Sequence, residues 1–205
     1  MFDRQLLSIT KPVVEAAAKL ALRYEVKPDQ ITLTGFGLGL FSAFIIAVGF
    51  PALALIFLIA SRLCDGLDGA VARLSNNQTH RGAFLDIALD FIFYASIPLG
   101  FAILNPTHNA LSAAVLLFAF VGTGTSFLAY AIMAEKQGLR STTYPTKSIY
   151  YLGGLTEGAE TLAAFIAMCL WPAWFPSIAS IYAALCAVTT AMRIYAGWET
   201  FGTRS

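Results

Sequence analysis

Four aspartates with helical spacing stand in a stretch of sequence that is otherwise apolar. Asp65 and Asp68 are three residues apart and Asp86 and Asp90 are four apart, so on helices each pair projects from one face. Because the connection between the two helices is short, we expect antiparallel neighbours whose four carboxylates meet in one pocket. Like charges repel strongly in an apolar environment, so such carboxylates either protonate or hold cations. Ligands that are all oxygen favour Mg²⁺, Mn²⁺ or Ca²⁺, and carboxylates from two helices suit a pair of ions.

The residues around the aspartates leave room for a ligand. The segment is rich in residues without bulk, which permit close helix packing and let a flat ligand approach the backbone: Gly66, Gly69, Ala70 and Ala72. Arg73 lies one helical turn after Gly69 and could bind a phosphate in bidentate fashion. Farther upstream, Gly35-x-x-x-Gly39 offers another close-packing face.

Two other interpretations of the charges stay open on spacing alone. They could form intramembrane ion pairs that help the helices assemble, Arg62 with Asp65 or Arg73 with an aspartate. A divalent-cation transporter would also place carboxylates in the membrane. Charges in the hydrocarbon layer are costly enough that function is the default interpretation. A transporter needs polar residues along its whole path, and residues 97–104 and 110–121 supply almost none.

The composition indicates an integral membrane protein. Of the 205 residues, 58% are hydrophobic and 12% are charged, and the mean hydropathy is +0.70, well above that of a soluble domain. The net charge of +1 gives no basic surplus, so we expect no nucleic-acid partner. We predict an all-α integral membrane protein of one domain, residues 1–205, with six transmembrane helices between about 31 and 195. The six apolar stretches, close to the roughly 20 residues that cross the hydrocarbon, are 31–50, 52–73, 83–104, 110–133, 149–171 and 174–195.

The basic residues predict the orientation of these spans. The connections near 49–51, 105–109 and 171–176 carry no Lys or Arg, whereas the two termini and the second and fourth connections carry them. By the positive-inside rule, both termini and those two connections face the cytoplasm. The aspartates flank the second connection, so the site is predicted at the cytoplasmic side.

A further helix is predicted ahead of the first span, over about 2–26. Four charged residues recur there every four positions: Lys11, Glu15, Lys19 and Arg23. The other side carries apolar residues: Val13, Val14, Ala17, Leu20 and Ala21. This pattern fits an amphipathic helix in the cytoplasmic interface, its basic stripe toward lipid headgroups. A solvent-facing helix packed on the bundle is the alternative.

The aspartates belong to a longer pattern. The string Asp65-x2-Asp68-Gly69-x2-Ala72-Arg73-x8-Gly82-x3-Asp86-x3-Asp90 resembles the signature of the CDP-alcohol phosphotransferase family, and all eight specified positions are met. An interfacial N-terminal helix followed by six spans is also that family's layout. The segment Pro28-Asp29-Gln30-Ile31-Thr32 resembles the family's Pro-Asn-x-x-Thr opening of the first span, with Asp29 in place of Asn. Over its whole length the chain is similar to small inner-membrane members from Gram-negative bacteria.

The resemblance implies a reaction and its metal ligands. A phosphatidyl group would pass from CDP-diacylglycerol to the hydroxyl of a small alcohol, releasing CMP, in phospholipid biosynthesis; a CDP-alcohol donor with diacylglycerol as acceptor is the nearest variant. Asp65, Asp68, Asp86 and Asp90 would hold two divalent cations, Mg²⁺ or Mn²⁺, and Asp90 would also be the general base. The family resemblance further implies a homodimer in the bacterial inner membrane.

The same resemblance implies contacts with the donor. Gly69 and Gly82 would let the cytidine lie against the backbone, and Ala72 would keep the helices close. Arg73 would bind phosphate, and Thr32 would contact the donor.

Two features of the sequence bear on the acceptor. Phe91 follows Asp90, where family members that use glycerol phosphate or inositol phosphate commonly carry a cation. Glu157 and Glu160 form a second acidic pair, predicted inside the 149–171 span and facing the same cavity. They either hydrogen-bond a polyol or amine on the acceptor or fix the bundle by pairing with Lys147, Arg193 or Arg62.

Overall fold

A computed structural model gives the architecture of the chain. The structure describes residues 3–139 and 154–202, and every regular element in these two stretches is a helix, which confirms the all-α fold class. The elements in order are α1 (Asp3–Arg23), α2 (Pro28–Ala47), α3 (Pro51–Leu74), α4 (His80–Leu104), α5 (Pro106–Lys136), α6 (Gly158–Leu170), the 3₁₀ turn η1 (Pro172–Trp174) and α7 (Phe175–Gly202).

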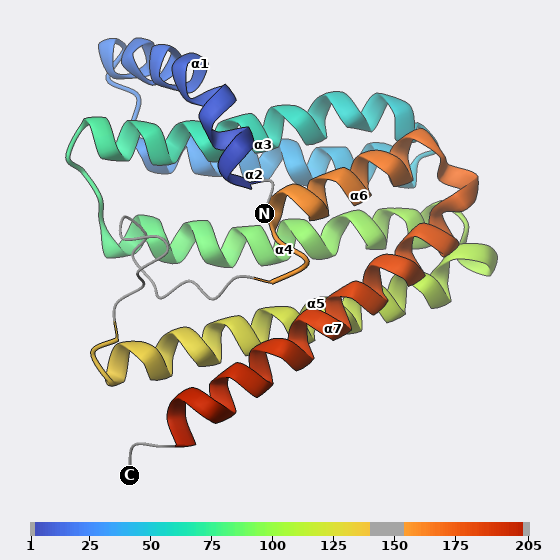
Figure 1. Cartoon of the computed structure of the whole chain (residues 1–205). Helices are drawn as coiled ribbons and strands as arrows, with labels where there is room; N and C mark the ends of the chain where they lie inside the picture. The colour runs from blue at the N-terminus through green and yellow to red at the C-terminus, as the bar shows by residue number, and fades with distance from the viewer. Residues whose placement is uncertain (1–2, 140–153, 203–205) are drawn as a thin grey trace.

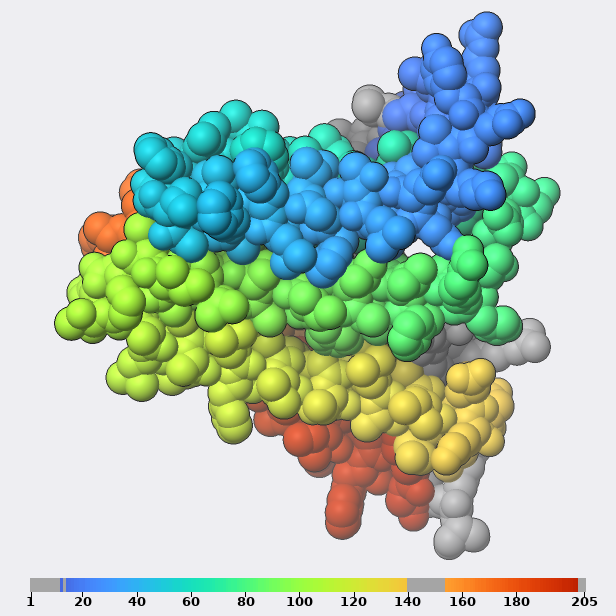
Figure 2. Space-filling view, turned by 180° about the vertical axis from the view of Figure 1, so that it is seen from behind, coloured from blue at the N-terminus to red at the C-terminus, as the bar shows by residue number. Residues whose placement is uncertain are grey.

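The helices α2 to α7 run back and forth between two ends of a bundle (Figure 1). The α2–α3, α4–α5 and α6–α7 turns lie at one end, and the α1–α2 and α3–α4 connections lie at the other with the last turns of α5 and α7. From behind, α2, α4 and α5 form neighbouring bands (Figure 2), in agreement with the packing of α4 against both α2 and α5. The loops thus alternate between the two ends as the charge pattern predicts; which end faces the cytoplasm stays a prediction.

Four helices in the described stretches are long and apolar enough to cross a membrane: Pro28–Ala47, His80–Leu104, Pro106–Lys136 and Pro172–Gly202. Helix α3 has 24 residues, which corresponds to about 36 Å, but its C-terminal half carries the charged site. Helix α6 has only 13 residues, fewer than the roughly 20 that a span requires. The predicted span at 149–171 is therefore not seen as one helix; residues 154–157 are not helical, and 140–153 lie outside the described residues.

Helix α1 packs against α3. Ala18 is fully buried and forms a small apolar cluster with Ile31 of α2 and with Ala70 and Val71 of α3. Leu20, expected on the apolar side, is 54% exposed. The helix therefore contacts the bundle, as one of the two sequence interpretations expected, and its position in the membrane interface stays a prediction.

The Gly35-x-x-x-Gly39 face packs closely, as predicted. A Cβ added to Gly35 would lie 2.7 Å from Cys64 Cβ of α3, and one added to Gly39 would lie 2.5 Å from Phe93 Cδ2 of α4. Both distances are shorter than any ordinary contact, so these glycines let α2 approach α3 and α4 at once. Helix α2 thereby packs against both aspartate-bearing helices and holds α3 and α4 in place relative to each other.

Replacing Gly35 by Ala should destabilise the bundle by about 1–3 kcal/mol, because the added methyl group overpacks the α2–α3 contact. Gly37→Ala is the matched control: nothing lies within 4 Å of its added Cβ, and Ala is the better helix former. Thermal unfolding in detergent should show a lower melting temperature for Gly35→Ala only. Equal melting temperatures would contradict the close-packing role.

Candidate functional site

The aspartates lie on two antiparallel helices joined by a short exposed connection, residues 75–79. Thr79 begins α4 as its N-cap, and its side chain accepts a hydrogen bond from Gly82 N at 3.0 Å. This cap fixes the first turn of α4 and so sets where Asp86 and Asp90 project. Residues three and four apart share a helix face, which turns both aspartate pairs toward the gap between α3 and α4.

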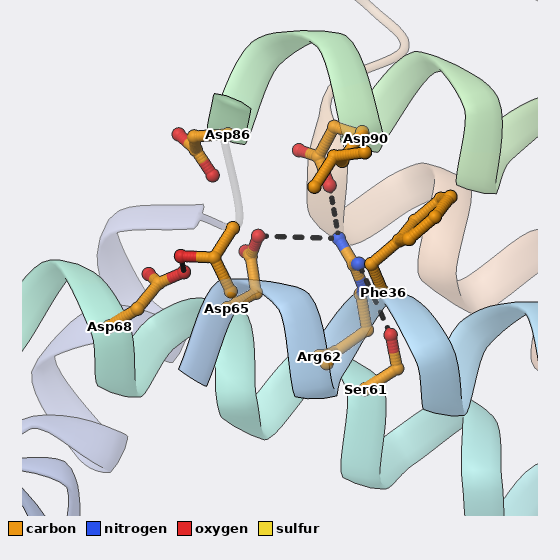
Figure 3. Close-up of a pocket in the computed structure, with 10 residues that line it drawn as sticks. Phe36, Ser61, Arg62, Asp65, Asp68, Asp86 and Asp90 are labelled. Carbon is orange, nitrogen blue, oxygen red and sulfur yellow. Dashed lines mark hydrogen bonds and ion pairs between the residues drawn. The ribbon is translucent and has the colours of Figure 1, made fainter. Parts of the chain in front are cut away.

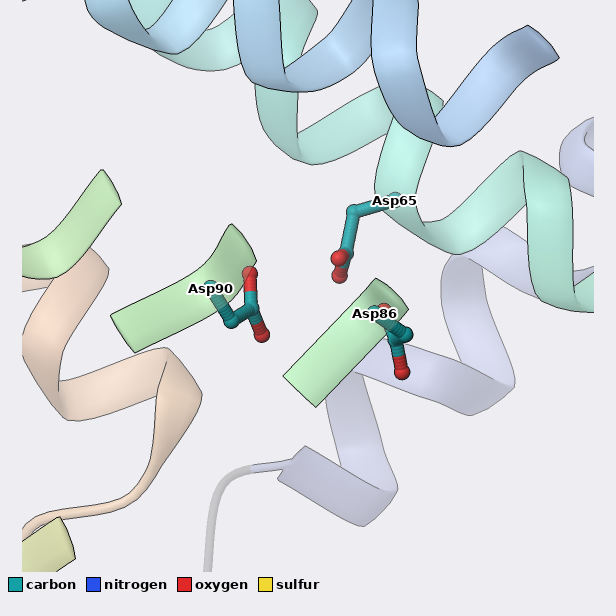
Figure 4. Close-up of side chains that lie close together, drawn as sticks. All are labelled: Asp65, Asp86 and Asp90. Carbon is teal, nitrogen blue, oxygen red and sulfur yellow. The ribbon is translucent and has the colours of Figure 1, made fainter. Parts of the chain in front are cut away.

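The four predicted aspartates line one pocket. Asp65, Asp86 and Asp90 each offer one carboxylate oxygen, and these oxygens lie within 4.8 Å of one another (Figure 4). Asp68 stands beside this group and accepts a hydrogen bond from Thr32 Oγ1 at 2.5 Å. The predicted convergence is confirmed, with Asp68 held by α2.

Arg62 places a positive charge in the same pocket (Figure 3). Its Nη1 lies 2.8 Å from Asp90 Oδ1 and 3.6 Å from Asp65 Oδ1. The i,i+3 contact with Asp65 was one of the ion pairs considered from the sequence. The pair with Asp90 joins residues 28 apart and was missed, because it depends on the side chain reaching across to α4.

The donor set fits hard divalent cations. Two unit charges 4.8 Å apart repel by roughly 3 kcal/mol at an effective dielectric constant of about 20, and one guanidinium offsets only part of that repulsion among several carboxylates. Among the described residues, the pocket lining offers carboxylate and hydroxyl oxygens and no His or Cys. Oxygen ligands of this kind suit Mg²⁺, Mn²⁺ or Ca²⁺ rather than softer metals.

The predicted donor-contact residues other than Thr32 lie outside the acidic pocket, nearer the α3–α4 connection. Arg73 is exposed and folds back over Gly69; a Cβ at Gly69 would lie 3.2 Å from Arg73 Nη1. Ala72 is half-buried in the last turns of α3. The missing side chain at Gly69 therefore gives Arg73 room to lie along its own helix.

Gly82 lies close to Thr79 and Asp29, two residues that line a second hollow at this end of the bundle. A Cβ added to Gly82 would lie 3.6 Å from Asp29 Oδ1, and Asp29 forms an ion pair with Arg81. The hollow has a volume of about 290 Å³ and is lined by Lys27, Pro28, Asp29, Asn77, Thr79 and Arg81. No role for Asp29 follows from the sequence pattern; in the structure its ion pair with Arg81 connects the start of α2 to the start of α4.

The Glu157–Glu160 pair lies at the start of α6. Glu157 is the N-cap residue, and its backbone N–H donates to Glu160 Oε2 at 3.2 Å in a reciprocal capping box. Glu157 Oε1 also accepts a hydrogen bond from Gly154 N at 3.1 Å. The expectation of a helical position is therefore wrong for Glu157, which precedes the helix, and holds for Glu160, which lies in its first turn; hydropathy does not register a capping signal.

Known proteins resemble this chain in sequence. The sequence model of the CDP-alcohol phosphatidyltransferase family matches residues 26–192. Inner membrane protein YnjF of Escherichia coli is 46% identical over 200 residues, which cover 98% of this chain and 97% of that protein. Archaetidylinositol phosphate synthase of Pyrococcus horikoshii is 32% identical over 93 residues, 45% of this chain and 50% of that one.

Solved structures share the fold. Mycobacterium tuberculosis phosphatidylinositol phosphate synthase PgsA1 in complex with manganese and citrate superposes with a TM-score of 0.73, at 22% identity over 90% of this chain and 88% of that one. The same enzyme with CDP-DAG bound gives a TM-score of 0.66, at 22% identity over 91% of this chain and 94% of that one. With the family match extending over most of the sequence and the signature aspartates gathered in one pocket, this chain belongs to the CDP-alcohol phosphatidyltransferase family.

Proposed function

We propose that the protein transfers a phosphatidyl group from CDP-diacylglycerol to the hydroxyl of a small alcohol, releasing CMP, as a step of phospholipid biosynthesis. The observation that carries this proposal is the meeting of three carboxylate oxygens within 4.8 Å at signature positions of the family. The related fold of PgsA1, with manganese in one structure and CDP-DAG in another, supports it.

In this proposal Asp65, Asp68, Asp86 and Asp90 hold two divalent cations, Mg²⁺ or Mn²⁺. When bound, such ions offset the negative charge of the donor diphosphate and of the departing CMP. Asp68 reaches its position through Thr32, whose hydroxyl donates to Asp68 Oδ2 and so turns this carboxylate toward the pocket. Asp86 and Asp90 lie one turn apart on α4 and face α3 together.

Asp90 acts as the general base. Its carboxylate accepts the proton of the acceptor hydroxyl, the hydroxyl oxygen bonds to the phosphorus that carries diacylglycerol, and the bond from that phosphorus to the CMP oxygen breaks. CMP leaves with the electron pair. Because Arg62 binds one oxygen of Asp90, the other oxygen is available for this proton transfer.

The residues near the α3–α4 connection contact the nucleotide. Gly69 and Gly82 let the cytidine approach the backbone, Ala72 keeps the helices close, and Arg73 binds phosphate. Thr32 contacts the donor from the wall of the acidic pocket, where its hydroxyl donates a hydrogen bond to Asp68.

The protein, in our proposal, is embedded in the membrane with a defined orientation. The chain forms six spans in the bacterial inner membrane, with both termini and the active site at the cytoplasmic side and α1 in the interface. It works as a homodimer. The inner-membrane relative from Escherichia coli supports this location.

Purified protein should release CMP from CDP-diacylglycerol only when Mg²⁺ or Mn²⁺ and an acceptor are present, and EDTA should stop the release. Asp90→Asn should lower the turnover rate by at least about a hundredfold, because it removes the proton acceptor. Glu135→Gln, an exposed change at the end of α5, is the matched control and should behave like the parent. Chromatographic measurement of CMP tests all of these outcomes.

A divalent-cation transporter would give the opposite pattern. Liposomes containing the protein would take up Mn²⁺, detectable with an internal fluorescent chelator, and no CMP would form. That result would refute the proposed reaction.

Lipid mass spectrometry after incubation with CDP-diacylglycerol should reveal a new phospholipid with one alcohol of a panel: glycerol phosphate, inositol, inositol phosphate, serine or choline. Diacylglycerol with a CDP-alcohol donor belongs in the same panel as the nearest variant. A product formed only from that second pair would reverse the assignment of donor and acceptor.

Thr32→Val should weaken activation by metal, because Asp68 loses the hydroxyl that orients it at 2.5 Å. We expect the Mn²⁺ concentration for half-maximal CMP release to rise by about tenfold to a hundredfold, as for the loss of one hydrogen bond to a charged group. Thr34→Val is the control, since the Thr34 hydroxyl bonds only to the Gln30 carbonyl among the described residues and is exposed. Identical metal dependence in both variants would remove Thr32 from the site.

A further inference from the structure

Arg62 is a half-buried cation that the family signature does not contain. Its side chain is 15% exposed, and it lies on α3 one turn before Asp65, on the face that meets α4. Its guanidinium bridges Asp90 and Asp65, two of the three residues whose carboxylate oxygens converge. Arg62 and a bound metal ion would therefore interact with the same carboxylates.

The surroundings hold the guanidinium in one place. Arg62 Cζ lies 4.0 Å from the centroid of the Phe93 ring, within the range of a cation–π contact. Arg62 Nη2 donates to the hydroxyl of Ser61 at 3.3 Å, and Ser61 is fully buried. The planar group is thus fixed by a ring on one face and by hydrogen bonds at its edge, which a flexible surface ion pair does not achieve.

This contact constrains Asp90 in particular. Arg62 binds Asp90 Oδ1 at 2.8 Å, and the second oxygen of Asp90 is turned toward the Asp86 side of the pocket (Figure 3). A carboxylate held by one oxygen keeps a single orientation, so the remaining oxygen faces the space where a reacting hydroxyl must come. Without Arg62, the side chain of Asp90 could rotate toward a divalent cation held by the other three aspartates.

Arg62 also alters the charge of the whole site. Four aspartates and one guanidinium line the pocket. With all four aspartates ionised, the net charge of the pocket is three negative, whereas two divalent ions carry four positive charges. The loaded site keeps one positive charge for an anionic diphosphate. With Arg62 neutralised, the loaded site would have no net charge, and the ions would bind without a competing cation.

We propose that Arg62 is a positioning residue that fixes Asp90 and serves as the internal counter-cation of the aspartate cluster. Its guanidinium offsets the repulsion among the carboxylates when divalent ions are absent. Because it competes with those ions, it also lowers the affinity of the site for them. Its effect on turnover rests on the proposed phosphatidyl transfer, whereas its effect on metal binding and on stability without metal does not.

The test compares Arg62→Gln, which removes the charge, with Arg62→Lys, which keeps the charge but loses the planar bridge and the ring contact. Lys136→Gln, an exposed change at the end of α5, is the matched control. Each protein is purified in detergent and stripped with EDTA. Mn²⁺ is then titrated in by calorimetry, the melting temperature is measured with and without Mn²⁺, and kcat and KM are taken from CMP release.

Arg62→Gln should bind Mn²⁺ more tightly than the parent, by on the order of tenfold. It should melt at a lower temperature without metal and regain stability with Mn²⁺. Its kcat should fall by about a hundredfold, as for a misplaced catalytic group, with little change in KM for CDP-diacylglycerol. Arg62→Lys should keep the parent's Mn²⁺ affinity yet lose a similar share of kcat. Lys136→Gln should match the parent throughout.

Unchanged or weaker Mn²⁺ binding by Arg62→Gln would overturn the counter-cation role, since a purely structural residue would not tighten metal binding when removed. If Arg62→Gln does not fold, full turnover by Arg62→Lys would overturn the positioning role. A parent that binds Mn²⁺ but releases no CMP, with Arg62→Gln still binding more tightly, would refute the proposed reaction and leave the counter-cation role standing.

Discussion

Repulsion among carboxylates held close together by packed helices is the constraint on which the rest of the site depends. The oxygens of Asp65, Asp86 and Asp90 approach within 4.8 Å. Asp86 is exposed, but Asp65 and Asp90 are partly buried, and charges among packed helices are screened less than charges in bulk water. Two side chains of the protein offset part of this negative charge: the Arg62 guanidinium forms an ion pair with Asp90, and the Thr32 hydroxyl donates a hydrogen bond to Asp68. The remainder calls for cations from outside, so the proposed binding of hard divalent ions depends on how tightly the helices pack.

That packing is set by small residues on α2. Gly35 and Gly39 let one helix touch both α3 and α4, and the same close approach brings Thr32 to Asp68 and Phe36 to the pocket wall. A larger side chain at either glycine would separate α2 from its neighbours and withdraw the hydroxyl that orients Asp68. The glycines and the aspartates therefore act as one unit, although they lie in different segments of the chain.

The spacing of the aspartates along the chain predicted the features that depend on helical periodicity alone. The i,i+3 and i,i+4 aspartate pairs on antiparallel neighbours predict a shared pocket, and the structure has it. The bond from Arg62 to Asp90 and the ion pair of Asp29 with Arg81 depend on side chains that reach between helices, which no periodicity encodes. Hydropathy also placed Glu157 within a span, whereas a capping box makes it the first residue before α6. Two glutamates three residues apart, Glu157 and Glu160, resemble a capping signal. The apolar stretches on both sides nevertheless led hydropathy to assign them to a span.

The position of the acidic pocket along the bundle follows from two opposing demands. A charged residue costs less free energy near the end of a membrane helix than at its centre, and the aspartates occupy the last half of α3 and the first half of α4, beside the exposed connection at 75–79. A donor with lipid tails, as proposed, must at the same time keep those tails in the hydrocarbon while its diphosphate reaches the ions. A site farther outside would pull the tails into water, and a site deeper inside would bury four carboxylates beyond the reach of a water-soluble acceptor. The pocket depth that satisfies both is the one at which α3 changes from an apolar to a charged helix.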